Sequence, residues 1–164
     1  MFRALRQHFW VTAGATLVAL GSVALPAVAQ KTDLTLAGGT ITFPAPTATD
    51  YVNGFVNSTT GVAYTVDATN GNGSHTTTVL IRATSADLGN GKVLSDLQWR
   101  RSDLSAWNSI GATNTQVEQK VMIRGTLNDP WNNTIFFRMV LDWTKDAPAI
   151  YTANYQVTLS QTVP

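Results

Sequence analysis

Aspartate is the residue type in this chain best suited to hydrolytic chemistry. Two carboxylates about 5–10 Å apart can cleave a glycosidic bond, one as general acid and the other as base or nucleophile. Four aspartates in or beside loop sequence offer such pairs: Asp96, Asp103, Asp129 and Asp142. Loop aspartates are common in extracellular domains, however, and acid–base catalysis also needs a shielded pocket that separates their pKa values. We therefore expect no enzyme and assign no catalytic residue, with a small hydrolase as the less favoured alternative.

Nucleophilic catalysis by a serine would depend on His75, because the other histidine, His8, lies in an N-terminal targeting segment. Such a mechanism needs a serine beside the histidine and a third group that orients the imidazole. His75 follows the sequence Asn-Gly-Asn-Gly-Ser, and the chain contains no Gly-x-Ser-x-Gly turn. This context favours an exposed histidine in a turn.

Metal binding has an equally weak basis in the sequence. Calcium takes several oxygen ligands from one or two loops, and Asp87 and Asn90 offer two of them, with Asp96 in the next segment. The EF-hand pattern Asp-x-Asp-x-Asp-Gly is absent, so a turn held by Asp87 is the favoured interpretation. The chain has no cysteine, which excludes disulfides, thiol catalysis and Cys-ligated zinc. We expect no metal and no cofactor.

Tryptophan is the residue type best suited to ligand binding here. Trp107 and Trp131 lie in or near polar loop sequence, and an exposed indole can stack on a sugar or anchor a partner protein. These two residues are the candidate ligand-binding residues, with packing of their loops over the sandwich edge as the alternative. Trp99 and Trp143 continue the apolar phase of neighbouring segments, so we expect both in the core.

The elements that must position these side chains are β-strands. The chain is rich in Thr and Val and contains only one Glu after residue 29, which favours strand over helix. Apolar and polar residues alternate with period two in nine segments: 33–36, 40–43, 51–56, 62–66, 77–83, 93–100, 116–124, 134–143 and 151–160. In the last segment one face carries Tyr151, Ala153, Tyr155, Val157 and Leu159. Such a strand has one buried and one solvated face, with Thr158 on the solvated side.

Turn residues separate these segments. Asn70–Gly73 has the Asn-Gly chemistry of a tight hairpin, and further breaks occur at 89–91, 128–130 and 146–148. Strands that recur every 8–15 residues or so between such turns indicate a sandwich. We therefore predict an all-β fold, a single antiparallel Ig-like β-sandwich of about 7–9 strands.

The first 29 residues, Met1–Ala29, have the pattern of a secretory signal peptide. Arg3 and Arg6 precede an apolar stretch over residues 10–25, and Ala27-Val28-Ala29 places small residues for cleavage before Gln30. A retained anchor helix is the alternative, but the apolar stretch is short and broken for a membrane span. Cleavage would leave residues 30–164, the length of one domain.

Charge argues against nucleic acid as a partner. The first 29 residues contain two of the 11 basic residues and none of the 10 acidic ones, so residues 30–164 are nearly neutral. Nucleic acids and anionic lipids need clustered Lys and Arg, and the one neighbouring basic pair, Arg100-Arg101, is typical of a solvated strand end.

The segment Tyr151–Pro164 resembles the closing strand of bacterial WxL-type cell-surface domains. In those domains a Tyr precedes Trp-x-Leu and a terminal Pro, and here Val157-Thr158-Leu159 occupies the Trp-x-Leu position with Val in place of Trp. The resemblance implies a secreted β-sandwich that binds the cell wall.

These observations predict a secreted, non-catalytic structural or adhesive protein of the cell surface or extracellular space, with the periplasm as another location. Its partners would be a cell-envelope component, a polysaccharide, another protein or copies of itself, with no nucleic acid and no membrane span after cleavage. Self-assembly could add a strand to a sheet edge, with Thr32–Phe43 as donor. The alternative is a carbohydrate-binding module that uses its loop tryptophans.

Overall fold

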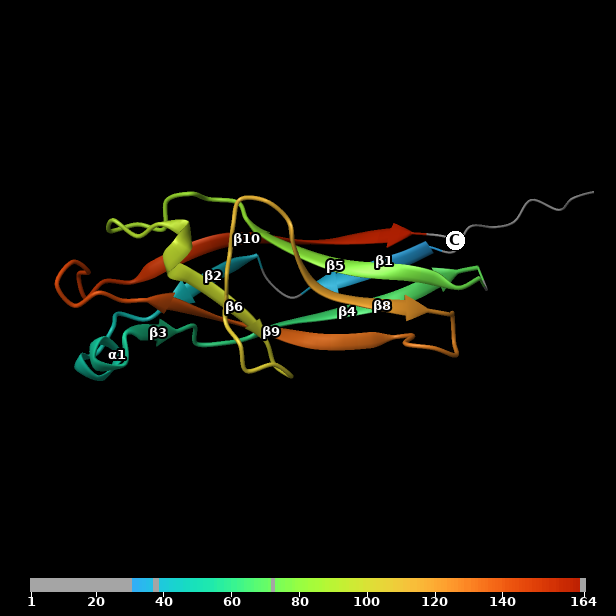
Figure 1. Ribbon diagram of the computed structural model, residues 1–164, viewed down its shortest axis with the longest axis horizontal. Helices are drawn as coiled ribbons and strands as arrows, with labels where there is room; N and C mark the ends of the chain where they lie inside the picture. Colours follow the sequence, from blue (N-terminus) through green and yellow to red (C-terminus); the bar gives the residue numbers. More distant parts are fainter. Residues whose placement is uncertain (1–30, 37–38, 72, 163–164) are drawn as a thin grey trace, which may run out of the picture.

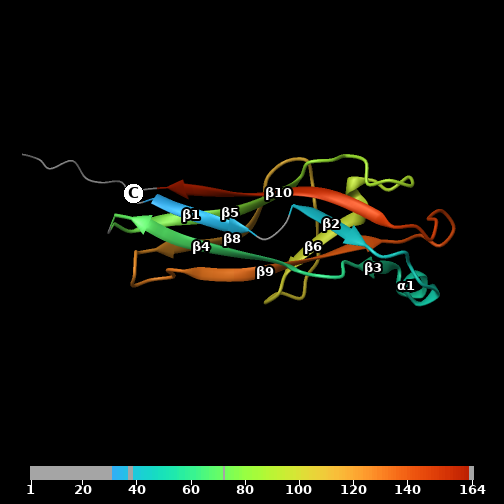
Figure 2. The same cartoon turned by 180° about the vertical axis from the view of Figure 1, so that it is seen from behind.

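Alternating side chains produce an all-β fold in the computed structural model, which describes residues 31–36, 39–71 and 73–162. The predicted signal peptide and Gln30 lie outside these residues. The described part contains two antiparallel sheets, as the sequence pattern predicts for a sandwich, with ten strands where about 7–9 were predicted. The strands pack as two layers, with β10 and β5 above β4 and β9 in Figures 1 and 2.

The larger sheet is built around one central strand, β9 (Trp131–Val140). The strands of this sheet lie in the order β1 (Lys31–Leu36), β4 (Val62–Asn70), β9, β6 (Leu97–Arg101) and β7 (Asn108–Ser109). A further strand, β3 (Phe55–Asn57), also pairs with β9. β6 pairs with residues 135–139 of β9 along one edge. β4 and β3 therefore pair with β9 along its other edge, at residues 131–135 and 138–140 respectively.

The smaller sheet has the order β2 (Thr40–Phe43), β10 (Tyr151–Thr162), β5 (His75–Ala83) and β8 (Thr115–Met122). The segment proposed above as a donor strand, Thr32–Phe43, therefore forms parts of β1 and β2 within its own chain. It contributes one strand to each sheet, β1 beside β4 and β2 beside β10.

The core lies between the two layers and consists of the inward rows of each strand. In β10 the predicted row is confirmed for Tyr151, Ala153, Tyr155 and Val157, all of which are buried. Leu159 is only half-buried. Thr158 is also half-buried rather than solvated. Thr158 and Leu159 therefore differ less in burial than the alternating pattern predicts.

The turn at Asn70–Gly73 is a crossover between sheets and not the predicted hairpin. β4 precedes it in the larger sheet and β5 follows it in the smaller one, and the two strands do not pair. Gly71 has φ 78°, so the Asn-Gly pair does reverse the chain. The local chemistry predicts the reversal, but burial of both strands against one core determines which sheet the next strand joins.

One segment predicted as a strand, 51–56, is strand only in its last two residues, which belong to β3, and its first three residues are helix. Thr47 caps the N-terminus of α1 (Ala48–Asn53). Its backbone N–H donates to the Asp50 carboxylate at 2.8 Å, and the Asp50 N–H donates to Thr47 Oγ1 at 3.3 Å. Gly54, with φ 77°, ends the helix. This capping box, Thr-x-x-Asp, is a sequence signal that competes with the alternating pattern. A similar short turn of 3₁₀ helix, Leu94–Asp96, delays β6 to residue 97.

Candidate functional site

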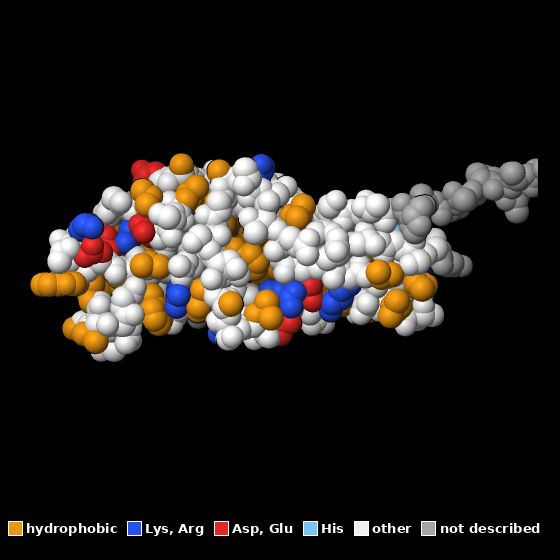
Figure 3. Space-filling model, in the orientation of Figure 1, with side chains coloured by type: hydrophobic (Ala, Val, Ile, Leu, Met, Phe, Trp, Pro, Cys, Tyr) orange, Lys and Arg blue, Asp and Glu red, His pale blue; other side chains and the backbone are white. Residues whose placement is uncertain are grey.

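The end of the sandwich formed by α1 and the β9–β10 loop carries exposed apolar side chains. Hydrophobic groups gather there on the surface, at the left of Figure 3. A pocket of about 660 Å³ lies between the two segments. We call it the tip pocket, and its lining residues are Ala48, Tyr51, Val52, Trp143, Asp146 and Pro148.

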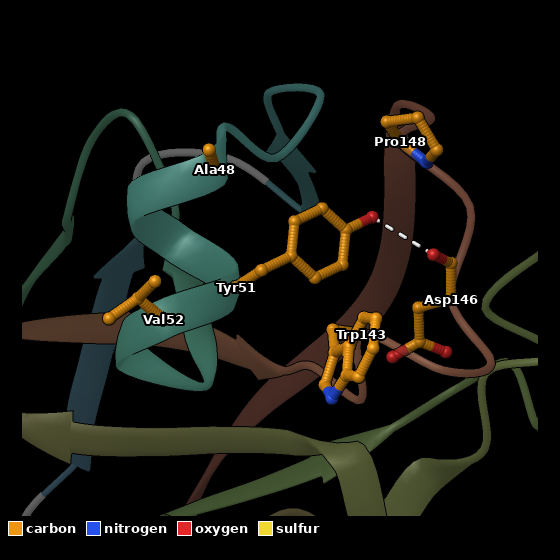
Figure 4. Close-up of a pocket in the computed structure, with 6 residues that line it drawn as sticks. All are labelled: Ala48, Tyr51, Val52, Trp143, Asp146 and Pro148. Carbon is orange, nitrogen blue, oxygen red and sulfur yellow. Dashed lines mark hydrogen bonds between the residues drawn. The ribbon is translucent and has the colours of Figure 1, made fainter.

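Hydrogen bonds hold the two sides of the tip pocket together. The Tyr51 hydroxyl donates to the Asp146 carbonyl oxygen at 3.0 Å, which joins helix to loop (Figure 4). The Asp146 carboxylate accepts from the Asp142 N–H at 2.6 Å and forms an ion pair with the buried Lys92. Trp143 is nevertheless 78% exposed, so this anchored loop presents an indole to solvent.

Two of the candidate catalytic aspartates, Asp96 and Asp142, come together beside the tip pocket. They line a pocket of about 380 Å³ together with Asn90, Gly91, Lys92, Lys145 and Asp146. The Asp142 carboxylate accepts from Thr144 Oγ1 at 2.6 Å and lies 2.9 Å from Lys145 Nζ. These hydrogen bonds hold the pKa of Asp142 well below its usual range, so this carboxylate is ionised and paired.

The other two candidate aspartates lie in separate structural contacts. Asp103 forms a two-point ion pair with Arg101, at 2.9 and 2.7 Å, which lowers the pKa of that carboxyl group. Burial would raise the pKa of Asp129, but hydrogen bonds from the Ala68 and Gly125 N–H groups outweigh it, and the pKa is lowered. The structure therefore brings together only half of the predicted carboxylate set.

The expected exposure of His75 is wrong. This residue begins β5 and is 1% exposed, because β5 starts immediately after the crossover turn and its first side chain points into the core. At the loop considered above for calcium, the Asp87 carboxylate accepts from the Gly89 N–H at 2.8 Å, which is the turn favoured there. Within the part of the chain that the structure describes, no group of three acidic, His or Cys side chains could hold a metal ion.

Two of the four tryptophans that the structure describes lie where the sequence does not predict them. Trp131 begins β9 and is buried, with its indole N–H donating to the Met122 sulfur at 3.1 Å, so the expected loop position is wrong. Trp143 is exposed rather than in the core, because β9 ends at Val140 and the alternation stops before residue 143. Trp99 is buried in β6 as expected.

Trp107, the remaining candidate, is half-buried on the outer face of the larger sheet. It lines a third pocket, of about 510 Å³, which we call the arginine pocket. The other lining residues are Phe55, Asn57, Ser58, Arg100, Ser105, Phe136 and Phe137. The position of Trp107 in loop sequence made it a candidate, but that reasoning missed Arg100, which lines the pocket, and Arg138, which borders it by stacking on Trp107 and Phe55. Both arginines belong to strand faces and come together only through the sheet register.

A buried polar cluster also escaped the sequence reasoning. Glu118 in β8 is 7% exposed and accepts from the Tyr64 hydroxyl of the opposite sheet at 2.7 Å. Arg101 lies 3.4 Å and Lys120 3.3 Å from the same carboxylate. Burial, followed by this hydrogen bond, raises the pKa of Tyr64. A buried carboxylate with several donors is a structural link between sheets.

Comparison with known proteins identified no relative of this chain. No protein-family model, no curated protein and no solved structure matches the chain. The resemblance of its last strand to WxL-type domains stays a prediction. Among the described residues, no helix is long and apolar enough to cross a membrane.

Proposed function

We propose that this chain is a secreted, non-catalytic adhesive protein of the cell surface or extracellular space, and that its tip pocket binds polysaccharide. The observation that carries the proposal is the exposed indole of Trp143 on an anchored loop, next to the exposed Val52 of α1. Monomeric proteins rarely leave large apolar side chains grouped on one surface unless that surface makes contacts.

The composition of the tip pocket supports a sugar ligand. Tyr51 and Trp143 present aromatic rings from opposite sides of the pocket, as Figure 4 shows, and such rings pack against the apolar faces of sugar rings. Asp146 also lines the pocket, but its carboxylate is held by Lys92 and by the Asp142 N–H. Mostly apolar walls with a few polar groups are typical of ligand-binding pockets.

The polar groups near the tip pocket support a binding role rather than a catalytic one. The carboxylates of Asp142 and Asp146 already have lysine partners, and the histidine of β5 is buried in the core. Assembly of copies by strand addition stays a prediction.

A pull-down on insoluble polysaccharides tests the proposal. Purified protein should be retained on at least one of cellulose, chitin and peptidoglycan. Trp143→Ala should weaken retention roughly tenfold, the usual effect of removing an aromatic side chain that a ligand covers on binding. Val121→Ala is the matched control, because Val121 is an exposed apolar residue of β8, outside the tip pocket. Equal retention of the Trp143 variant, or no retention of the unchanged protein, would contradict the proposal.

A further inference from the structure

A second surface, independent of the tip pocket, has the chemistry of an anion site. We propose that the arginine pocket binds the carboxylate-bearing sugar of an acidic polysaccharide, a uronic acid residue, through Arg100, which lines it, and Arg138, which stacks on two of its lining rings. The proposal goes beyond the function assigned to the tip and uses none of its residues.

Sheet register brings the two arginines together. Arg100 in β6 lies opposite Phe136 in β9, and Arg138 in β9 lies opposite Gln98 in β6. Ile135, Phe137 and Met139 of β9 point into the core, so the alternating Phe136 and Arg138 belong to the outer face.

Aromatic rings surround both guanidinium groups. The Arg138 guanidinium carbon lies 4.5 Å from the Trp107 ring centre and 4.8 Å from that of Phe55. The Arg100 carbon lies 5.1 Å from the ring centres of both Trp107 and Phe136. Such stacking holds the two cations in fixed positions and leaves their edges available for hydrogen bonds.

Neither arginine has a counter-ion within the described part of the chain. No carboxylate there lies within 4.0 Å of Arg100 or Arg138, whereas the adjacent Arg101 contacts two. Arg138 donates only through Nε, to Gln98 at 2.7 Å, and Arg100 donates through Nη1 to the Leu104 carbonyl at 2.8 Å. Burial and then the charge of Arg100 lower the pKa of Arg138. An anion bound to both groups would offset the second of these effects.

The shape and the remaining polar groups favour a sugar carboxylate over a bare ion. Two guanidinium forks match a carboxylate by paired hydrogen bonds. Asn57, Ser58 and Ser105 line the same pocket and offer groups that can bond to hydroxyls. A space of about 510 Å³ is in the range of small-ligand pockets.

Calorimetric titration with trigalacturonate tests the assignment. The protein should bind this acid, and the fully methyl-esterified trisaccharide should not bind, because the ester removes the charge. Arg100→Gln and Arg138→Gln should each weaken binding roughly tenfold or more, the loss expected for one charge-assisted pair. The matched control is Arg82→Gln, an exposed arginine of β5 that donates to Gln156, and it should bind unchanged.

Three outcomes would overturn the inference: no binding of trigalacturonate, equal binding of its ester, or full competition by inorganic phosphate at equal concentration, which would indicate an unspecific anion site. If circular dichroism shows that Arg138→Gln does not fold, Arg138→Lys replaces it, because lysine keeps the charge but lacks the paired guanidinium donors. Unchanged binding by Arg138→Lys would also overturn the inference. Trp143→Ala should leave trigalacturonate binding intact, which separates this site from the tip pocket.

Discussion

At the scale of single residues, Gly61 determines how the chain passes over the outer face of the larger sheet. A Cβ atom at this position would lie 2.6 Å from Thr134 Cγ2 and 2.7 Å from Cε1 of the Phe136 ring. The same ring lies beside the Arg100 guanidinium. A residue without a side chain is therefore required where the connection between β3 and β4 packs against one wall of the arginine pocket.

We predict that Gly61→Ala lowers the free energy of unfolding by about 1–3 kcal/mol, the usual effect of overfilling a packed contact. Gly39→Ala is the control, since a Cβ there would meet no atom within 4 Å, and it should change stability by about 0.5 kcal/mol or less. Urea unfolding of both variants measures the difference. Equal midpoints would mean that the connection moves away from Phe136 without loss of stability.

At the scale of elements, β9 is the strand on which core and surface both depend. Its inner face supplies Ile135 to the core, while its outer face supplies Phe136 to the arginine pocket and Arg138 beside that pocket. It pairs with β3, β4 and β6. Because side chains alternate strictly along a strand, a slip of one residue would exchange the two faces.

Ile135→Ala should therefore cost about 2–5 kcal/mol, the range for a buried aliphatic side chain. Asn132→Ala, at an exposed position of the same strand, should cost about 0.5 kcal/mol or less. Thermal and urea unfolding of the pair would check the register. A larger loss for the asparagine variant than for the isoleucine variant would contradict the pairing of β9 described above.

At the scale of the whole molecule, aspartates tie the loops and strands together and make stability depend on pH. The pKa values of Asp103, Asp129 and Asp142 are lowered by their hydrogen bonds. The pKa of an aspartate in an unfolded chain is about 3.9. Because the pKa of each of these three groups is lower in the folded protein, its ionised form stabilises the fold fully above about pH 4. This stabilisation is lost as the pH falls through the folded values.

We expect the urea midpoint to be nearly constant from pH 7 to about pH 5 and to fall below about pH 4. Asp67 acts in the opposite direction, because its hydrogen bond with Asp129 raises its pKa and favours its protonated form at low pH. Asp103→Asn should make the decrease of the urea midpoint at low pH less steep, because one of the carboxyl groups whose protonation destabilises the fold has been removed. A midpoint that stays level to pH 2.5 or so would contradict this linkage.

Local patterns in the sequence were sufficient for the fold class. Period-two alternation predicted the inward row of β10, and the sheets are those of an antiparallel sandwich, because alternation and turn chemistry act between neighbouring residues. The capping box at Thr47 is also local, and it explains why α1 replaces a predicted strand.

Only the tertiary structure decided which strands pair and which side chains meet. The Asn-Gly reversal at residue 71 leads into the other sheet, the alternation that buries Phe137 stops before Trp143, and β9 begins early enough to bury Trp131. Arg100 and Arg138 are far apart in the sequence and converge on Trp107 through the β6–β9 register. Pairing of distant strands depends on how all of the apolar rows are buried together, and that is a property of the whole core rather than of any one segment.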